Sequence, residues 1–361
     1  MGLIRAAAVA LAALLALPAG ADVPAPAEGS VRVATYAPAL TRRGPGLLLR
    51  DIRSGKDDQI AAAARVIVAA QADVIVLTSF DWDHDGLALD AFAALLADQG
   101  LDYPHRFAGP PNSGLATGID MDGDGRSGRP DDAQGFGQFR GAGGMAVLSR
   151  LPLGAVTDYS AVLWRNLPGN LMPDDTPPQV AQVQRLSSTA HWDVPVQTGA
   201  GVLHLLAWSA TPPVFGRDGG ERNARRNHDE AMFWLHHLPD APFVLAGNAN
   251  LDPSDGNGRH EAIRALIAAA QDPQPRNDWP VPQGAHDAAQ TGDPALDTAF
   301  WPDRAPGNLR VSYLLPSKGQ QVTGSGIIWP DPDTPLGAAV AAASAHRLVW
   351  VDLRPGAEQM R

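Results

Sequence analysis

The chain has 361 residues, of which 45% are hydrophobic and 19% are charged, and its formal net charge is −11. This composition is typical of a globular protein and excludes a largely disordered chain. The only lysines are Lys56 and Lys318, which argues against a nucleic-acid partner, because phosphate backbones are bound by clustered cationic side chains. The chain has no cysteine, which excludes disulfides, thiol nucleophiles and thiolate metal ligands.

The first residues are typical of a secretory signal. Arg5 precedes an apolar stretch at 6–17 and a small-residue site at 19–21. The stretch is shorter than the ~20 residues that span a bilayer, which favours a cleaved signal over a membrane anchor. We therefore predict a secreted or periplasmic protein without a membrane span. Its parts are a signal peptide at 1–21, a linker at 22–30, one domain at 31–354 and a C-terminal tail at 355–361.

Hydrophobic periodicity predicts strands and helices that alternate along the chain, which indicates an α/β fold. The predicted strands are 31–36, 74–77, 145–149, 184–194, 202–208, 243–246, 309–315, 326–329 and 346–353. The predicted helices are 57–71, 89–96, 224–236, with Asn223 as its N-cap, and 261–270. Long irregular segments are expected at 110–144 and 273–306. No linker separates two domains.

Four segments form an ordered set of strand-end motifs. They are 31–36 followed by Ala37, the segment 143–152, the turn GNANLDP at 247–253 and the segment SAHRLVW at 344–350. Together they resemble the endonuclease/exonuclease/phosphatase superfamily, the metal-dependent phosphoester hydrolases related to DNase I and sphingomyelinase. The resemblance implies a DNase I-like fold, a four-layer α/β sandwich of two packed mixed β-sheets flanked by helices. It also implies phosphoester hydrolysis with Mg²⁺ in a cleft at the strand ends.

The resemblance places neutral residues at most of the reactive positions of that cleft. By this resemblance, Ala37 stands at the position of the first-strand Asn, Ser79 at that of the metal-binding Glu, and Ser209 at that of the strand His. Asn248 stands at the position of the Asp in the Gly-Asp-x-Asn turn, Ser312 at that of an acid in the penultimate strand, and Ala345 at that of the Asp in the terminal Asp-His pair. A hydroxyl is a poor substitute for an anionic ligand, and an amide cannot act as a base. The retained catalytic candidates are Asn250 and His346, with Asn248 as a third.

These substitutions predict that Mg²⁺ binding at the cleft, and the hydrolysis that depends on it, are weakened or lost. The expected partner is a small phosphoester or another ligand. The alternative is an inactive pseudoenzyme that binds a ligand or a protein through the old cleft. Each retained residue also has a structural interpretation: Asn250 and Asn248 as turn residues, and His346 as a core residue.

Two groups of aspartates could bind a cation. Asp120, Asp122 and Asp124, followed by Gly125, resemble a calcium loop whose twelfth position is Asp131. The alternative is an acidic turn without metal. The segment 81–85 contains three more aspartates just after the lost Glu position; they could supply a carboxylate to the cleft or cap the next helix.

Three further residues are candidates for ligand binding. His191 and Asp193 alternate onto one face of a polar strand, and Arg226 lies near the start of a predicted helix. All three could meet an anionic ligand. The alternatives are an ordinary strand and a helix face with ion pairs.

Overall fold

The computed structural model describes residues 23–216 and 218–354. The expected signal peptide at 1–21 and the tail at 355–361 lie outside the described residues. Within the described ranges, no helix is long and apolar enough to pass through a bilayer.

In the described part of the chain, the first sheet has six strands in the order β10-β11-β1-β2-β4-β3. They are β1 (Val31–Tyr36), β2 (Val74–Phe80), β3 (His105–Phe107), β4 (Gly144–Ser149), β10 (Gln321–Ile328) and β11 (Leu348–Arg354). β1 and β2 are parallel and the other neighbours are antiparallel. The sheet is therefore mixed, and β1 lies near its centre.

The second sheet, counted over the same described ranges, has five strands in the order β5-β6-β7-β8-β9. They are β5 (Thr157–Asp158), β6 (Ala190–Thr198), β7 (Gly201–Ser209), β8 (Phe243–Asn248) and β9 (Ser312–Pro316). β7 and β8 are parallel, and the other pairs are antiparallel. This sheet is mixed as well.

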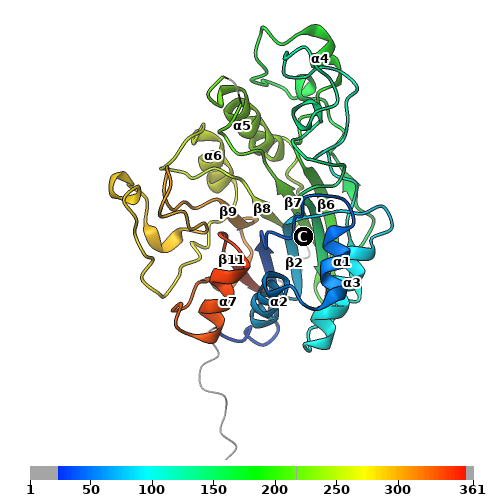
Figure 1. The fold of residues 1–361 in the computed structure, drawn as a ribbon. Coiled ribbons are helices and arrows are strands. Elements are labelled where there is room, and N and C mark those ends of the chain that lie inside the picture. The colour runs from blue at the N-terminus through cyan, green and yellow to red at the C-terminus, as the bar shows by residue number, and fades with distance from the viewer. Residues whose placement is uncertain (1–22, 217, 355–361) are drawn as a thin grey trace, which may run out of the picture.

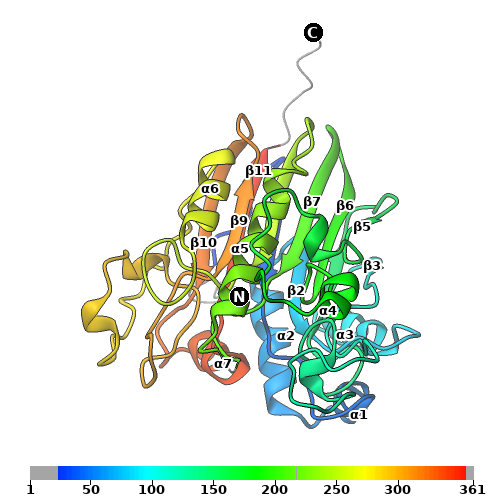
Figure 2. The same ribbon diagram turned by 90° about the horizontal axis from the view of Figure 1, so that it is seen from above.

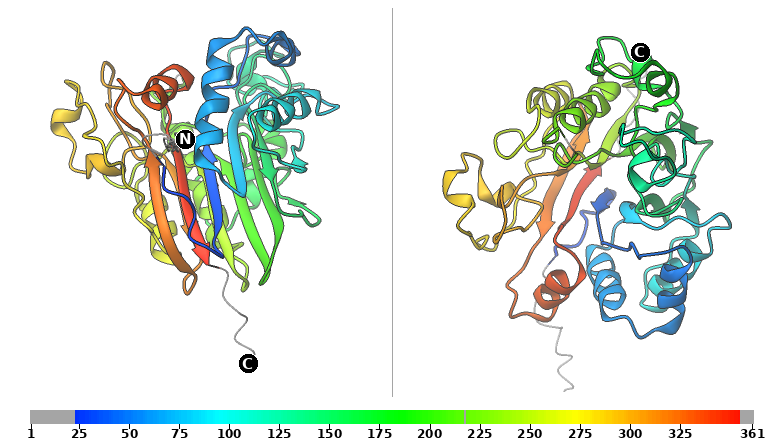
Figure 3. Two further views of the ribbon diagram at one scale, coloured as in Figure 1. Left: turned by 90° about the horizontal axis from the view of Figure 1, so that it is seen from below. Right: turned by 45° about the horizontal axis from the view of Figure 1, so that its top comes forward.

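Helices cover the outer face of each sheet (Figure 1). The helices of the first sheet are α1 (Leu47–Ser54), α2 (Asp58–Ala70), α3 (Leu87–Asp98) and α7 (Pro335–Ala343). The helices of the second sheet are α5 (Glu221–Leu235) and α6 (Glu261–Ala269). A short helix, α4 (Pro178–Val183), lies outside these layers. The right view of Figure 3 shows both sheets between the two helix layers.

Three apolar clusters hold the layers together. One packs α2, α3 and α7 on the first sheet, and another packs α5 and α6 on the second. The third lies between the sheets and joins side chains such as Val33 and Val76 to Trp192 and Val244. Alternate residues of β1 face the two sides, with Ala34 toward the helices and Val33 toward the second sheet. The predicted four-layer sandwich is confirmed.

Several local predictions need correction. β6 begins at Ala190, because residues 184–189 leave the sheet to contact α5. Helix α5 begins after Gly220, so Asn223 lies inside the helix and is not its cap. The strand predicted from residue 346 begins at Leu348. The irregular segments 110–144 and 273–306 are confirmed and flank the sheets on opposite sides (Figure 2).

Candidate functional site

Neutral polar side chains lie at one edge of the second sheet, at the ends of three neighbouring strands. Ser209 at the end of β7 is the register partner of Asn248 at the end of β8, and Asn248 is in turn the partner of Ser312 at the start of β9. All three are at least nine-tenths buried. The structure thus brings three of the substituted positions into one row.

The facing edge of the first sheet carries the other positions. Ala37 follows β1, and Ser79 is the bulge residue of β2, where the register with β4 shifts and φ is 55°. His346 lies just before β11 and bridges to Ala299. Thr298, the neighbour of Ala299, accepts the backbone amide of Ser312 on its hydroxyl oxygen. This segment joins the two sheet edges.

We call Ser209, Asn248, Asn250, Ser312 and His346 the strand-end site. The site holds amides, hydroxyls and one imidazole. These groups can form hydrogen bonds with an oxyanion, but they cannot neutralise its charge.

The imidazole of His346 has lost the carboxylate that the resemblance implies. Among the described residues, its buried Nδ1 has no hydrogen-bond partner. Its ring meets Trp301 edge-on, with 5.4 Å between the ring centroids. Burial, followed by the charges of Arg347 and Arg304, lowers the pKa of His346 to about 4. The imidazole is therefore neutral at neutral pH, and no carboxylate fixes its tautomer.

The two asparagines of the β8 turn are engaged in the turn itself. The Asn248 Oδ1 accepts the backbone amide of Asn250 at 2.9 Å. The Asn250 Nδ2 donates to the carbonyl of Ala210 at 2.7 Å, and Asn250 has a φ of 50°. This geometry favours the turn role for both residues, although an amide held in this way is also well oriented.

The donor set at the strand-end site does not fit Mg²⁺, which prefers carboxylate oxygens. The aspartates that follow β2 do not replace the lost ligands. Asp81 accepts the backbone amides of Arg42 and Gly143, one on each oxygen. Asp83 caps α3 through two backbone amides. The capping interpretation of this segment is therefore supported.

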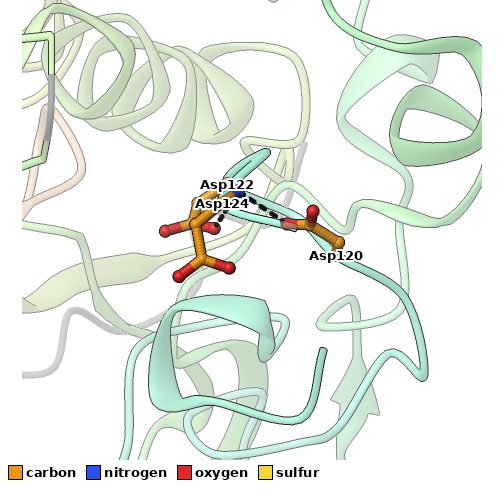
Figure 4. Close-up of side chains that lie close together, drawn as sticks. All are labelled: Asp120, Asp122 and Asp124. Carbon is orange, nitrogen blue, oxygen red and sulfur yellow. Dashed lines mark hydrogen bonds between the residues drawn. The ribbon is translucent and has the colours of Figure 1, made fainter. Parts of the chain in front are cut away.

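The Asp loop is the one group in the described ranges where three or more acidic, His or Cys ligand atoms lie within 4.8 Å of one another. It consists of Asp120, Asp122 and Asp124, whose carboxylates gather at one turn (Figure 4). Asp120 accepts the amides of Gly123 and Gly125, which lowers its pKa.

Asp131, the expected fourth ligand, lies outside this group. It is exposed on the 3₁₀ helix η1 (Pro130–Asp132). Its neighbour Asp132 turns toward the loop instead, and accepts the backbone amide of Met121 at 2.8 Å.

The three candidate ligand-binding residues are not brought together. His191 is buried, and its ring nitrogens contact the Ser187 hydroxyl and the Glu230 carbonyl. Burial lowers its pKa to about 4. Asp193 accepts from His204, and the buried Arg226 donates to four backbone carbonyls. These contacts favour structural roles over direct ligand contact.

Two polar residues of α5 hold the strand ends, and one of them, Glu230, was not a candidate from the sequence. Asn227 donates to the carbonyls of Thr211 and Ala249, and Glu230 accepts the amides of Ser188 and Thr211. Both are completely buried. With Asn223 and Arg226 they recur at i, i+3, i+4 and i+7, which is the pattern of one helix face and could have identified Glu230.

Comparisons with known proteins agree with this architecture. Residues 50–346 match the model of the Endonuclease/Exonuclease/phosphatase family. A search of curated proteins finds no match. The chain belongs to this family, because the match spans most of its length.

Two solved structures have a similar fold. An endonuclease/exonuclease/phosphatase from Beutenbergia cavernae is 20% identical, with a TM-score of 0.57 over 91% of this chain and 72% of that chain. A family protein from Leptotrichia buccalis is 13% identical, with a TM-score of 0.51 over 90% of this chain and 99% of that chain. At these sequence identities, the similarity shows a shared fold alone.

Proposed function

We propose that this protein is a family member in which metal-dependent phosphoester hydrolysis is weakened or lost, and that its strand-end site binds a small phosphoester. The observation that carries the proposal is the buried row of Ser209, Asn248 and Ser312. Ionised carboxylates at such positions would hold a cation, whereas these neutral groups offer only hydrogen bonds.

The expected loss in hydrolysis rate follows from the catalytic roles that have no suitable residue in this chain. Each catalytic role, whether proton transfer or charge stabilisation, contributes roughly 10²-fold or more to the rate. The resemblance assigns a metal ligand to Ser79 and a base to Asn248, and both are neutral. We therefore expect at most traces of hydrolysis in the wild-type protein.

A metal panel tests the loss of hydrolysis. Purified protein would be assayed with Mg²⁺, Mn²⁺ and Ca²⁺ on p-nitrophenyl phosphate and bis-p-nitrophenyl phosphate. We expect little activity from the wild type. We expect a gain of Mg²⁺-dependent activity from the combined variant Ser79→Glu, Asn248→Asp, Ser312→Asp and Ala345→Asp. Robust wild-type turnover that the double variant Asn250→Ala, His346→Ala abolishes would contradict the proposal.

A second candidate role concerns the Asp loop. We propose that Asp120, Asp122 and Asp124 bind Ca²⁺ and order the segment 110–144, because their ligand atoms already lie within 4.8 Å of one another. Calorimetric titration with Ca²⁺ would be repeated on Asp122→Ala. One site in the wild type and none in the variant supports the role, and equal stoichiometry rejects it.

We also propose that the protein is exported, on the basis of the signal pattern at 1–21. Expression of the full chain in a bacterial host, followed by fractionation and mass spectrometry of the mature N-terminus, tests this. Cleavage near residue 21 is the expected result. An intact N-terminus in the cytoplasmic fraction would reject export.

A further inference from the structure

Arg347 is a buried cation beside the strand-end site. It directly follows His346 in the chain and is 2% exposed. Its backbone amide donates at 2.8 Å to the carbonyl of Thr298, and the Thr298 hydroxyl oxygen accepts the amide of Ser312. A single residue, Thr298, therefore joins Arg347 to the row of polar groups at the edge of the second sheet.

The guanidinium of Arg347 lies at the facing edge of the first sheet. Its Nη1 donates at 2.7 Å to the carbonyl of Ser344, and the Ser344 hydroxyl donates at 2.7 Å to the carbonyl of Ala37. The resemblance implies an asparagine at the position of Ala37. Ser344 alone therefore separates the cation from one of the substituted positions.

Arg347 differs from the other buried arginines of the described ranges, because no described carboxylate pairs with it. The three others each interact with a carboxylate, and these pairs are Arg32 with Asp352, Arg310 with Asp272, and Arg226 with Glu230. Burial lowers the pKa of Arg347 to about 10, and Tyr36 opposes this shift. Burial acts on Arg310 as well, but its ion pair leaves the pKa of that group raised.

Aromatic rings and backbone carbonyls compensate the Arg347 cation in part. Its Cζ lies 4.2 Å from the ring centroid of Trp329 and 5.5 Å from that of Phe300, and its Nη1 donates to two carbonyls. Among the described residues, its buried Nε has no hydrogen-bond partner, and neither has the Tyr36 hydroxyl or the His346 Nδ1. A buried cation is costly unless an opposite charge and hydrogen bonds compensate it. An anionic ligand would supply both.

We propose that Arg347 binds the phosphate group of a small phosphoester at the strand-end site, and that it supplies the positive charge that the neutral residues there lack. The inference rests on the proposed function and adds the residue that neutralises the ligand. A guanidinium suits this role, because it stays charged and its N–H groups match the geometry of phosphate oxygens. A cation that belongs to the chain would make phosphate binding independent of added metal.

Calorimetric titration of the full chain with sodium phosphate, first in EDTA and then in Mg²⁺, tests the inference. We expect the wild type to bind phosphate equally well in both buffers. The variant Arg347→Met should raise the Kd about tenfold or more, since a hydrogen bond to a charged group contributes at least that much. The matched control Arg53→Met removes the same charge from the exposed end of α1 and should keep the wild-type Kd.

Urea unfolding in phosphate-free buffer separates a ligand role from a structural one. Arg347→Met removes a buried charge that has no carboxylate partner among the described residues, so the urea midpoint should stay the same or rise. Arg53→Met should leave the midpoint unchanged. A lower midpoint of Arg347→Met together with an unchanged Kd would make Arg347 a structural residue and reject the inference.

The titration has further outcomes that overturn the inference. Equal Kd values for the wild type and Arg347→Met reject the role of Arg347 and leave the proposed function intact. Phosphate binding that is lost in EDTA identifies a metal ion as the source of positive charge. That comparison uses the wild type alone and applies even if Arg347→Met does not fold. Absence of phosphate binding in both buffers rejects the proposed function, and the inference with it.

Discussion

Replacing Glu230 with glutamine tests the hydrogen bonds that α5 makes to the segments around the strand ends. The Glu230 carboxylate is completely buried and accepts the backbone amides of Ser188 at 2.5 Å and Thr211 at 2.7 Å. Glutamine has the same size but turns an NH₂ group toward one of these amides. A buried donor without an acceptor costs about 1–3 kcal/mol. The charge of Glu230 also favours the buried Arg226 cation, and that contribution is lost as well.

We therefore expect Glu230→Gln to lower the free energy of unfolding by about 2–4 kcal/mol. Urea unfolding at pH 7.5, followed by tryptophan fluorescence, measures the change. Glu261→Gln is the matched control, since Glu261 is exposed in the first turn of α6 and should change stability by less than about 0.5 kcal/mol. An equally small effect of Glu230→Gln would show that the carboxylate does not hold both amides.

Three further predictions follow from single features. Phe215→Gly should raise the free energy of unfolding by about 1 kcal/mol in urea titrations, because it relieves a positive φ; a loss of stability would contradict the strain argument. Burial lowers the pKa of His191 and His346 to about 4, so the unfolded state binds more protons below about pH 6.5. Stability should then fall by about 1 kcal/mol per histidine between pH 7 and 5.5, and His191→Phe should remove part of this slope; an unchanged slope argues against a buried neutral His191. If the Asp loop binds Ca²⁺, a concentration 100 times the Kd should stabilise the wild type by about 2.7 kcal/mol; a chelator should reverse this, and Asp122→Ala should show no such response to either.

The fold was predictable because its signals are local or periodic. The apolar run of β2 is buried along nearly its whole length, as its sequence predicts for a central strand. The stripe of α2 is equally clear, and Asp57 caps it as its residue type favours. The start of β6 was not predictable, because residues 184–189 have strand-like composition. They leave the sheet through contacts with Arg226 and Glu230, which are distant in sequence.

The site was predictable in part, and for a different reason. The resemblance placed the substituted positions at strand ends, and in the structure Ser209, Asn248 and Ser312 are register partners along the second sheet. No local sequence pattern shows which hydrogen-bond partner each polar atom has in the folded chain. From the sequence, Arg226 was a candidate to bind an anion, but in the structure its guanidinium donates to backbone carbonyls instead. Whether a buried polar side chain is structural or functional depends on contacts made only in the folded chain.

The neutral residues at the strand ends are best understood as a set. Carboxylates that share a buried site repel one another unless a cation lies between them, and each then shifts toward its protonated form. Once one ligand is lost and the cation binds weakly, the remaining carboxylates destabilise the fold at neutral pH. Replacement of the others by serine, asparagine or alanine then relieves that repulsion. Asn250 and His346 carry no charge at neutral pH, given the low pKa of His346, so both can stay without a metal. Electrostatics therefore favours this pattern of neutral residues under the proposal that the strand-end site no longer binds a cation.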